Sequence, residues 1–589
     1  MQVIGIGVCS RRAFIFLVAL MTCAGIVGEK GLGVAFTSTA MAQDQAEPGA
    51  EGDSDTAVVE ASDPVLVVSI ASLNKLMQDV NYITSVAGQP QAGGMFTMMA
   101  GGFTQGLDMA RPIGIMVPIV DGAPEPIGLL PTPDVEAMLK RLEAQTGPVD
   151  KLDDGTLVLA AGPSLVYIRQ VGTWAVIARQ KELLELAPAD PMTVMEGLGD
   201  NYTLAARLNV QLIPEETREG LISQMRQGFE QAMAQQSDDV EGIQAASEDS
   251  IKQIEQLIRE AEELMLGWNI NPEEKVITFE AEFIAAEGTE LAEMYAGQKP
   301  IPSKFSAVID DENAMYYHAA ASIGPKLVER TQESVANAKT MLTKAIEDSD
   351  DLDENAKTQV TELMNSVVEL VGQTVAEGKF DLGAQAVADD GQLDITVGMF
   401  VSDGEAAAQI VKDLAEELKS EPQAPTFEFD QETYKDVTLH SMMIDIPADQ
   451  DELRETLGEK AVIKIGTAAN AVYLSAGTDS EKAIKEFIDG SDDEDDPSDR
   501  PVGQMQIRLL PFLRFAQSVE ANDVVASMID TLSQDDETDY MLVEANMIEN
   551  GQSSYIEIGE GILKAIGAAV REAQMQKMKE AQAAGNGQF

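Results

Sequence analysis

The two histidines of the chain, His318 and His440, are the first residues to test for chemistry. Each lies in a strand-like context, "MYYHAAAS" and "VTLHSMMI". A zinc site built on both is one interpretation, but it requires further convergent ligands and partners that orient them. We expect instead two half-buried strand histidines with hydrogen-bond partners. No metal ligand or catalytic residue is therefore assigned to them.

Motifs of the common enzyme classes are missing from the sequence. It contains no H-E-x-x-H, G-x-S-x-G or P-loop pattern. The run "IEIGEGILKAIG" only partly matches a dinucleotide loop, because Lys564 stands where the third glycine belongs. Carboxylates are too numerous for an acid/base pair to be chosen without distances. We predict no cofactor and favour a non-enzymatic protein, with a carboxylate-dependent hydrolase as an alternative.

The segment "GGMFTMMAGGF" combines soft thioethers, aromatic rings and flanking glycines. Methionine is an adaptable apolar filler, so packing in a core or a loop is one interpretation. A ligand or partner surface, such as a mobile lid over an apolar groove, is the second, and Cu(I) binding through the thioethers is the third. The candidate surface consists of Met95, Phe96, Met98, Met99 and Phe103.

Charge limits the classes of partner. The formal net charge is −60, and we find no cluster of Lys and Arg, so a phosphate backbone would be repelled and nucleic acid is excluded as a partner. The acidic run 491–499 lacks the spacing of a calcium-binding EF-hand, and we expect an exposed loop there. At 44% hydrophobic residues the chain can still build cores.

The N-terminus has the pattern of an export signal. Arg11 and Arg12 precede a short apolar run, and Ala40 and Ala42 offer a cleavage site, so residues 1–42 are expected to be removed. Cys9 and Cys23 both fall in that segment, which leaves the mature chain without disulfides or thiolate sites. The apolar run is too short for a membrane span, so we expect no integral span in the mature chain and a periplasmic or cell-surface location.

The stretch "SRRAFIF" resembles the twin-arginine signal of bacterial proteins that are exported folded, although Phe16 replaces the usual lysine. A general secretory signal with two arginines is the alternative. A third interpretation makes Cys23 in "LMTC" a lipidated anchor, although Met21 and Thr22 fit that pattern poorly.

Four stretches predict two strands around a turn, followed by a helix. Their turns are placed at Asp121-Gly122, Asn271-Pro272, Asp390-Gly391 and Asn550-Gly551. Asx-Gly pairs favour hairpins because both turn positions need positive φ. The alternation of Ile277, Phe279, Ala281 and Phe283 with Thr278, Glu280 and Glu282 predicts one buried and one wet face. Helix N-caps are predicted at Thr132, Ser402 and Thr478.

A second kind of hairpin lies between the two units of each pair. Its two copies are "LVYIRQVGTWAVIARQKELLEL" and "AVIKIGTAANAVYLSAGTDSEKAIKEFI". The order of first hairpin type, second type and first type therefore occurs twice along the chain. This repeat predicts an α+β fold of two homologous lobes, with mainly antiparallel sheets and helices on one face. The predicted divisions are an acidic linker at 43–62, lobes at 63–300 and 301–560, and a C-terminal amphipathic helix with a polar tail at 561–589. The predicted helical pair Pro325–Ile346 and Glu354–Glu377 is matched to helical patterns around 214–266.

The signal segment, the acidic body and the duplicated layout together resemble large exported proteins of unassigned function from planctomycete bacteria. The resemblance implies no catalytic residues. We expect an exported binding or interaction protein that uses strand faces and the groove between lobes, with an unknown protein or hydrophobic ligand as partner. A carrier for a hydrophobic small molecule or lipid is the alternative from a different class.

Overall fold

The computed structural model describes residues 63–585, except for 162–163, 236–240, 350–353, 390, 420–423, 449–453, 455–457, 492–496, 498–499 and 535. The expected export signal with Arg11, Arg12, Ala40, Ala42, Cys9 and Cys23, the linker, and most of the acidic run lie outside the described residues. Export and its route stay predictions.

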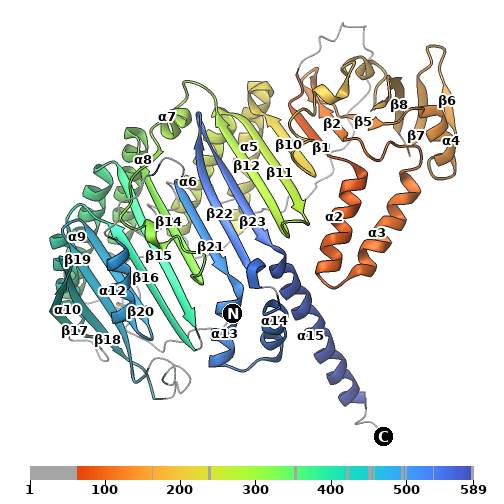
Figure 1. Cartoon of the computed structure of the whole chain (residues 1–589). Coiled ribbons are helices and arrows are strands. Elements are labelled where there is room, and N and C mark those ends of the chain that lie inside the picture. Colours follow the sequence, from red (N-terminus) through yellow and green to blue (C-terminus); the bar gives the residue numbers. More distant parts are fainter. Residues whose placement is uncertain are drawn as a thin grey trace.

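The fold is α+β, with one large antiparallel sheet and a separate two-stranded ribbon (Figure 1). The strands of residues 66–285 are β1 (Leu66–Ile70), β2 (Ile113–Val117), β3 (Ile119–Val120), β4 (Ala123–Pro124), β5 (Ile127–Pro131), β6 (Val149–Lys151), β7 (Leu157–Ala161), β8 (Ser164–Val171), β9 (Trp174–Ala178), β10 (Leu204–Asn209), β11 (Ala261–Asn271) and β12 (Val276–Ala285). Those that follow are β13 (Lys299–Pro300), β14 (Met315–Ser322), β15 (Lys379–Asp389), β16 (Gln392–Phe400), β17 (Thr426–Tyr434), β18 (Val437–Asp445), β19 (Lys460–Ala468), β20 (Ala471–Gly477), β21 (Gly503–Arg508), β22 (Tyr540–Ile548) and β23 (Gly551–Gly559).

Helices connect these strands, and many extend beyond the sheet. The α-helices are α2 (Leu73–Val86), α3 (Pro90–Phe103), α4 (Val135–Thr146), α5 (Glu215–Gln235), α6 (Glu241–Glu260), α7 (Glu290–Ala296), α8 (Pro325–Glu347), α9 (Glu354–Ala376), α10 (Gly404–Leu418), α12 (Ser480–Gly490), α13 (Leu509–Val519), α14 (Asp523–Leu532) and α15 (Glu560–Gly585). Short 3-10 helices are η1 (Glu182–Glu185), η2 (Pro191–Thr193), η3 (Val210–Leu212), η4 (Ser306–Val308) and η5 (Asp536–Thr538).

The same strand order occurs in both halves of the sheet. Neighbouring strands of the first half follow the order β6-β7-β8-β9-β5-β2-β1-β10-β11-β12. Those of the second half follow β17-β18-β19-β20-β16-β15-β14-β21-β22-β23. The halves meet where β12 pairs antiparallel with β23, so they form one continuous sheet. This recurrence supports the predicted lobes, whereas their homology and their boundaries remain predictions.

The connecting helices follow the same scheme, and this corrects one prediction. The α8–α9 pair follows β14, as the α2–α3 pair follows β1. Its counterpart in the first half is therefore α2–α3 and not the helices at 215–260. Those helices, α5 and α6, lie between β10 and β11, as α13 and α14 lie between β21 and β22.

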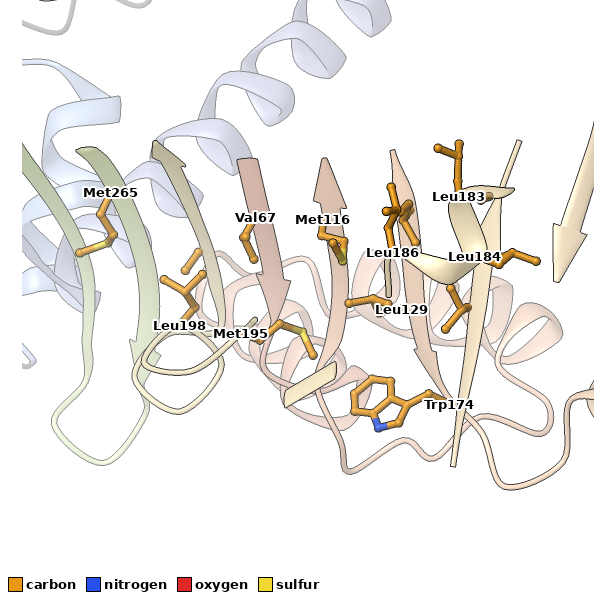
Figure 2. Close-up of a cluster of buried hydrophobic side chains, with 14 residues drawn as sticks. Val67, Met116, Leu129, Trp174, Leu183, Leu184, Leu186, Met195, Leu198 and Met265 are labelled. Atoms are coloured by element: carbon orange, nitrogen blue, oxygen red, sulfur yellow. The ribbon is translucent and has the colours of Figure 1, made fainter. Parts of the chain in front are cut away.

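Packing on both faces of the sheet corrects the prediction of helices on one face. On β9, Val176 joins a core with the 3-10 helix η1, while its neighbour Ala175 joins a core with α4 on the opposite face. Figure 2 shows the first of these cores, which combines side chains of the strands, such as Leu129 and Trp174, with Leu183 and Leu184 of η1. Strand β9 is apolar on both faces, so both need cover.

The hairpins are confirmed, and their details differ by a residue or two. The fourth turns at Glu549-Asn550, because Ile548 pairs with Gly551 and Asn550 takes the positive φ of 56°. After β9 the expected helix is only η1. The three N-caps are Asp134, Asp403 and Asp479, which replace the predicted Thr132, Ser402 and Thr478. In each case a carboxylate further along accepts the free backbone N–H groups of the first turn.

Candidate functional site

A polar cavity lies on the sheet at the junction of the two halves. It has a volume of about 320 Å³ and opens to solvent. Its lining comes from three adjacent strands, β12, β22 and β23: Glu280, Glu282, Glu544, Asn546, Ser553, Ser554 and Tyr555. We call this space the junction cavity.

Strand register aligns the polar side chains in two rows. Glu280 lies opposite Tyr555, which lies opposite Glu544. In the next row Glu282 lies opposite Ser553, and Ser553 opposite Asn546. Directly opposed residues point to the same face of a sheet, so three carboxylates from two halves of the chain share one small area.

The segment between β9 and β10, which covers the first-half core, contacts one residue of this cavity. Tyr202, near the end of that segment, donates a hydrogen bond from its hydroxyl to Glu280 Oε2 at 2.5 Å. Its ring lies directly on β11 at Gly267, where a Cβ would come within 2.4 Å of the ring. A glycine is needed here because any side chain would displace Tyr202. The covering segment thus fixes the position of Glu280, which lines the cavity.

A neighbouring carboxylate, Glu557, is fully engaged by tyrosines. Tyr555 donates to Glu557 Oε2 at 2.5 Å, and Tyr540 donates to Oε1. By contrast, within the described part of the chain no hydrogen bond or ion pair holds the carboxylate of Glu282 or Glu544. These two groups are therefore the ones available to a ligand.

Both carboxylates hold their protons more tightly than a free glutamate does. Partial burial, and then repulsion from Glu280 and Glu263, raises the pKa of Glu282 above its usual value. Burial, and then the nearby Glu557, raises the pKa of Glu544 in the same way. A positive group placed between them would lower both pKa values and gain from their charge.

A stability prediction follows from these shifts. A carboxylate whose folded pKa is raised binds protons more tightly in the folded state, so its contribution to stability falls as pH rises through the unfolded and then the folded pKa. We expect Glu544→Gln to raise the melting temperature at pH 7, and to do so much less at pH 4, where the glutamate is largely protonated in both states. Thermal unfolding at the two pH values measures this difference, and an equal effect at both would contradict the shift.

Histidines and metal ligands do not converge in the described residues. His318, on β14, is fully buried and its Nε2 lies 3.0 Å from Ser303 Oγ. His440, on β18, is also buried, its Nδ1 accepts from the Asp430 backbone N–H at 3.0 Å, and desolvation lowers its pKa. Both are more buried than predicted. Across the described ranges no group of three or more His, Cys, Asp or Glu is arranged to hold a metal ion.

The methionine-rich segment is helix α3, and its large side chains face solvent. Met95, Met98, Met99 and Phe103 are 67%, 75%, 63% and 62% exposed, and Phe96 is partly buried. They are not core residues, and such exposure does not fit a lid closed over a groove. Copper binding through these thioethers stays a prediction. Lys564, from the supposed dinucleotide loop, lies on α15 and pairs with Glu560 at 2.6 Å.

Comparison with known proteins gives no further guide, since no family model, curated protein or solved structure matches this chain. Function has to be argued from the junction cavity and from surfaces. Sequence reasoning missed this cavity. It expected Glu280 and Glu282 on a wet face and Phe279 on a buried one, whereas both glutamates are partly buried and Phe279 is 42% exposed. The missing information was the pairing of β12 with β23.

Proposed function

We propose that this chain is an exported, non-enzymatic binding protein, and that the junction cavity receives a cationic group of a partner. The observation that carries the proposal concerns two partly buried carboxylates beside the hydrogen-bonded Glu280. Among the residues that the structure describes, Glu282 and Glu544 have no hydrogen-bond or ion-pair partner for their carboxylates. A lysine or arginine side chain would supply the missing positive charge, and Asn546, Ser553 and Tyr555 add polar contacts. Such charge-assisted hydrogen bonds are the strong ones.

Hydrolysis by carboxylates receives less support from the same groups. An acid/base pair needs one carboxyl group held neutral and another held ionised. Here the pKa values of Glu282 and Glu544 are shifted in the same direction, upward. A bound cation would stabilise the ionised form of both glutamates, so the shared upward shift fits a cation-binding site better than an acid/base pair.

A capped tripeptide, Gly-Lys-Gly, is the probe for this proposal, with the same peptide acetylated on lysine as its uncharged counterpart. Titration calorimetry at low salt should show binding of the first peptide only. The double variant Glu282→Gln/Glu544→Gln should weaken binding by about tenfold, the scale of one hydrogen bond to a charged group.

The control must separate this cavity from the general acidity of the protein. Glu143 and Glu377 are exposed glutamates on other parts of the surface, so Glu143→Gln/Glu377→Gln removes the same charge. We expect that variant to bind the lysine peptide as the unaltered protein does. Equal losses in both variants, or equal binding of the acetylated peptide, would refute the cavity as the binding site.

A further inference from the structure

Helix α3 is an exposed apolar helix whose partner is not supplied by the described part of the chain. It packs on α2 through its small side: a Cβ on Gly93 would come within 2.5 Å of the Thr84 and Asn81 side chains. Asn81 also donates to Thr97 Oγ1 at 3.0 Å. Because the small and polar residues face α2, the methionines and Phe103 point away from it.

The α2–α3 hairpin is held firmly at its base. Lys75, in the first turn of α2, donates to the Ile270 carbonyl at 2.6 Å and pairs with Asp79 at 2.7 Å. Asp79 is 1% exposed and accepts from Thr203 Oγ1 at 2.7 Å. The hairpin is therefore a fixed projection of the fold, so the exposure of α3 is a property of the packed structure.

Charge distinguishes this projection from the rest of the molecule. From Val80 to Leu107 the sequence contains no charged residue, in a chain in which 24% of residues are charged and the net charge is −60. The adjacent helix α15 contacts α2 and extends outward near the hairpin (Figure 1). Its outer part exposes Arg571, Lys577 and Lys579 together with Met575 and Met578. The same stretch also contains Glu572 and Glu580, so three positive and two negative residues leave it with a small positive charge.

An uncharged apolar helix beside a helix end with exposed Lys and Arg side chains is the chemistry of a surface that enters the interface of a bilayer. Apolar side chains enter the boundary between headgroups and acyl chains, and Lys and Arg contact anionic headgroups. With 14 residues, α3 is about 21 Å long, too short to cross a hydrocarbon core of about 30 Å but able to lie in the interface. No helix in the described ranges has the length and hydropathy of a membrane span.

We infer that α3 and the outer part of α15 dock this protein on an anionic lipid bilayer, with α3 inserted in the interface. The acidic body is repelled by such a membrane, so the uncharged α3 and the weakly positive end of α15 are the parts that can approach it. A second copy of the chain is a less suitable occupant, because it would bring two strongly acidic bodies together. This inference is independent of the junction cavity.

Flotation with vesicles tests the inference on the chain purified from an exporting host. Vesicles of phosphatidylcholine containing phosphatidylglycerol should carry the protein upward in a density gradient. Met98→Glu/Met99→Glu should lower the partition coefficient at least tenfold, because two exposed apolar groups become charged. Phe103→Glu is a second, separate variant with the same expected direction. The unaltered protein and its variants have the same N-terminus, so any contribution of that segment to flotation is the same for all of them.

Matched controls show which part of the surface acts. Met341→Glu alters an exposed methionine on α8, 38% accessible, and should leave flotation unchanged. Lys577→Gln/Lys579→Gln should weaken binding to vesicles with phosphatidylglycerol and should not affect binding to phosphatidylcholine alone. Thermal unfolding verifies that each variant is folded.

Two results would overturn the inference. One is equal flotation of the unaltered protein and of Met98→Glu/Met99→Glu. The other is no flotation, combined with a dimer in sizing and light scattering that the same substitutions dissociate. That second result would assign the α3 surface to another copy of the chain.

Discussion

Gly551→Ala is expected to destabilise the protein by about 3 kcal/mol, at the upper end of the cost of overpacking a packed site. Gly551 begins β23, and a Cβ there would lie 1.9 Å from the carbonyl oxygen of Phe283 and 3.0 Å from Ile284 Cα on β12. Both are backbone atoms, so only a shift of one strand relieves the contact. Because β12 and β23 join the halves, we expect the variant to unfold in two separated transitions in a denaturant titration.

A matched glycine gives the control. Gly228, within α5, has nothing within 4 Å of an added Cβ. Gly228→Ala should stabilise the protein by up to about 1 kcal/mol, because alanine is the better helix former. If the two variants shifted the unfolding midpoint in the same direction, the pairing of β12 with β23 at this register would be wrong.

Asp539→Ala is expected to lower the free energy of unfolding by about 3–5 kcal/mol, as for other buried ion pairs that lose one partner. The Asp539 carboxylate is fully buried. Arg508 donates to its Oδ1 from Nε at 3.0 Å, and the backbone N–H of Leu510 donates to Oδ2 at 2.8 Å. Removal takes away the carboxylate that Arg508 Nε and the Leu510 N–H use as acceptor, although Arg508 Nη1 keeps the Asp311 carbonyl at 3.4 Å. Chemical denaturation measures the loss.

An exposed pair shows what burial contributes. Lys151 and Glu136 lie 2.5 Å apart, with side chains that are 55% and 62% exposed. Glu136→Ala should change the free energy of unfolding by less than about 1 kcal/mol, since water and salt screen such pairs. If Asp539→Ala lowered the free energy of unfolding as little as Glu136→Ala does, Asp539 would not be buried as described.

The junction cavity and the α3 surface would have different tasks if both proposals hold. The cavity lies on the sheet where β12, β22 and β23 meet, whereas α3 and α15 extend beyond the strands (Figure 1). A protein docked through α3 would keep the cavity free for a basic group on a partner. Measuring lysine-peptide binding with and without vesicles would show whether the two events are independent.

Local sequence determined the elements of this fold. The Asp-Gly pair at Asp121 and Gly122 forms a turn with φ values of 52° and 81°, as the residue types require. Alternation on β12 placed Glu280 and Glu282 on one side of the strand, but it did not predict that they are partly buried and that Phe279 is exposed. Hairpins and amphipathic helices depend on neighbours in sequence, so their signals are readable without a structure.

Tertiary structure alone decided what those elements meet. The pairing of Glu280 with Tyr555 joins residues of different halves, and no local propensity specifies such a partner. Local sequence did not determine the exposure of Met98 either, because a methionine-rich helix has the same sequence whether it is buried or exposed to solvent. Burial and long-range register are set by packing of the whole chain, and both candidate surfaces follow from them.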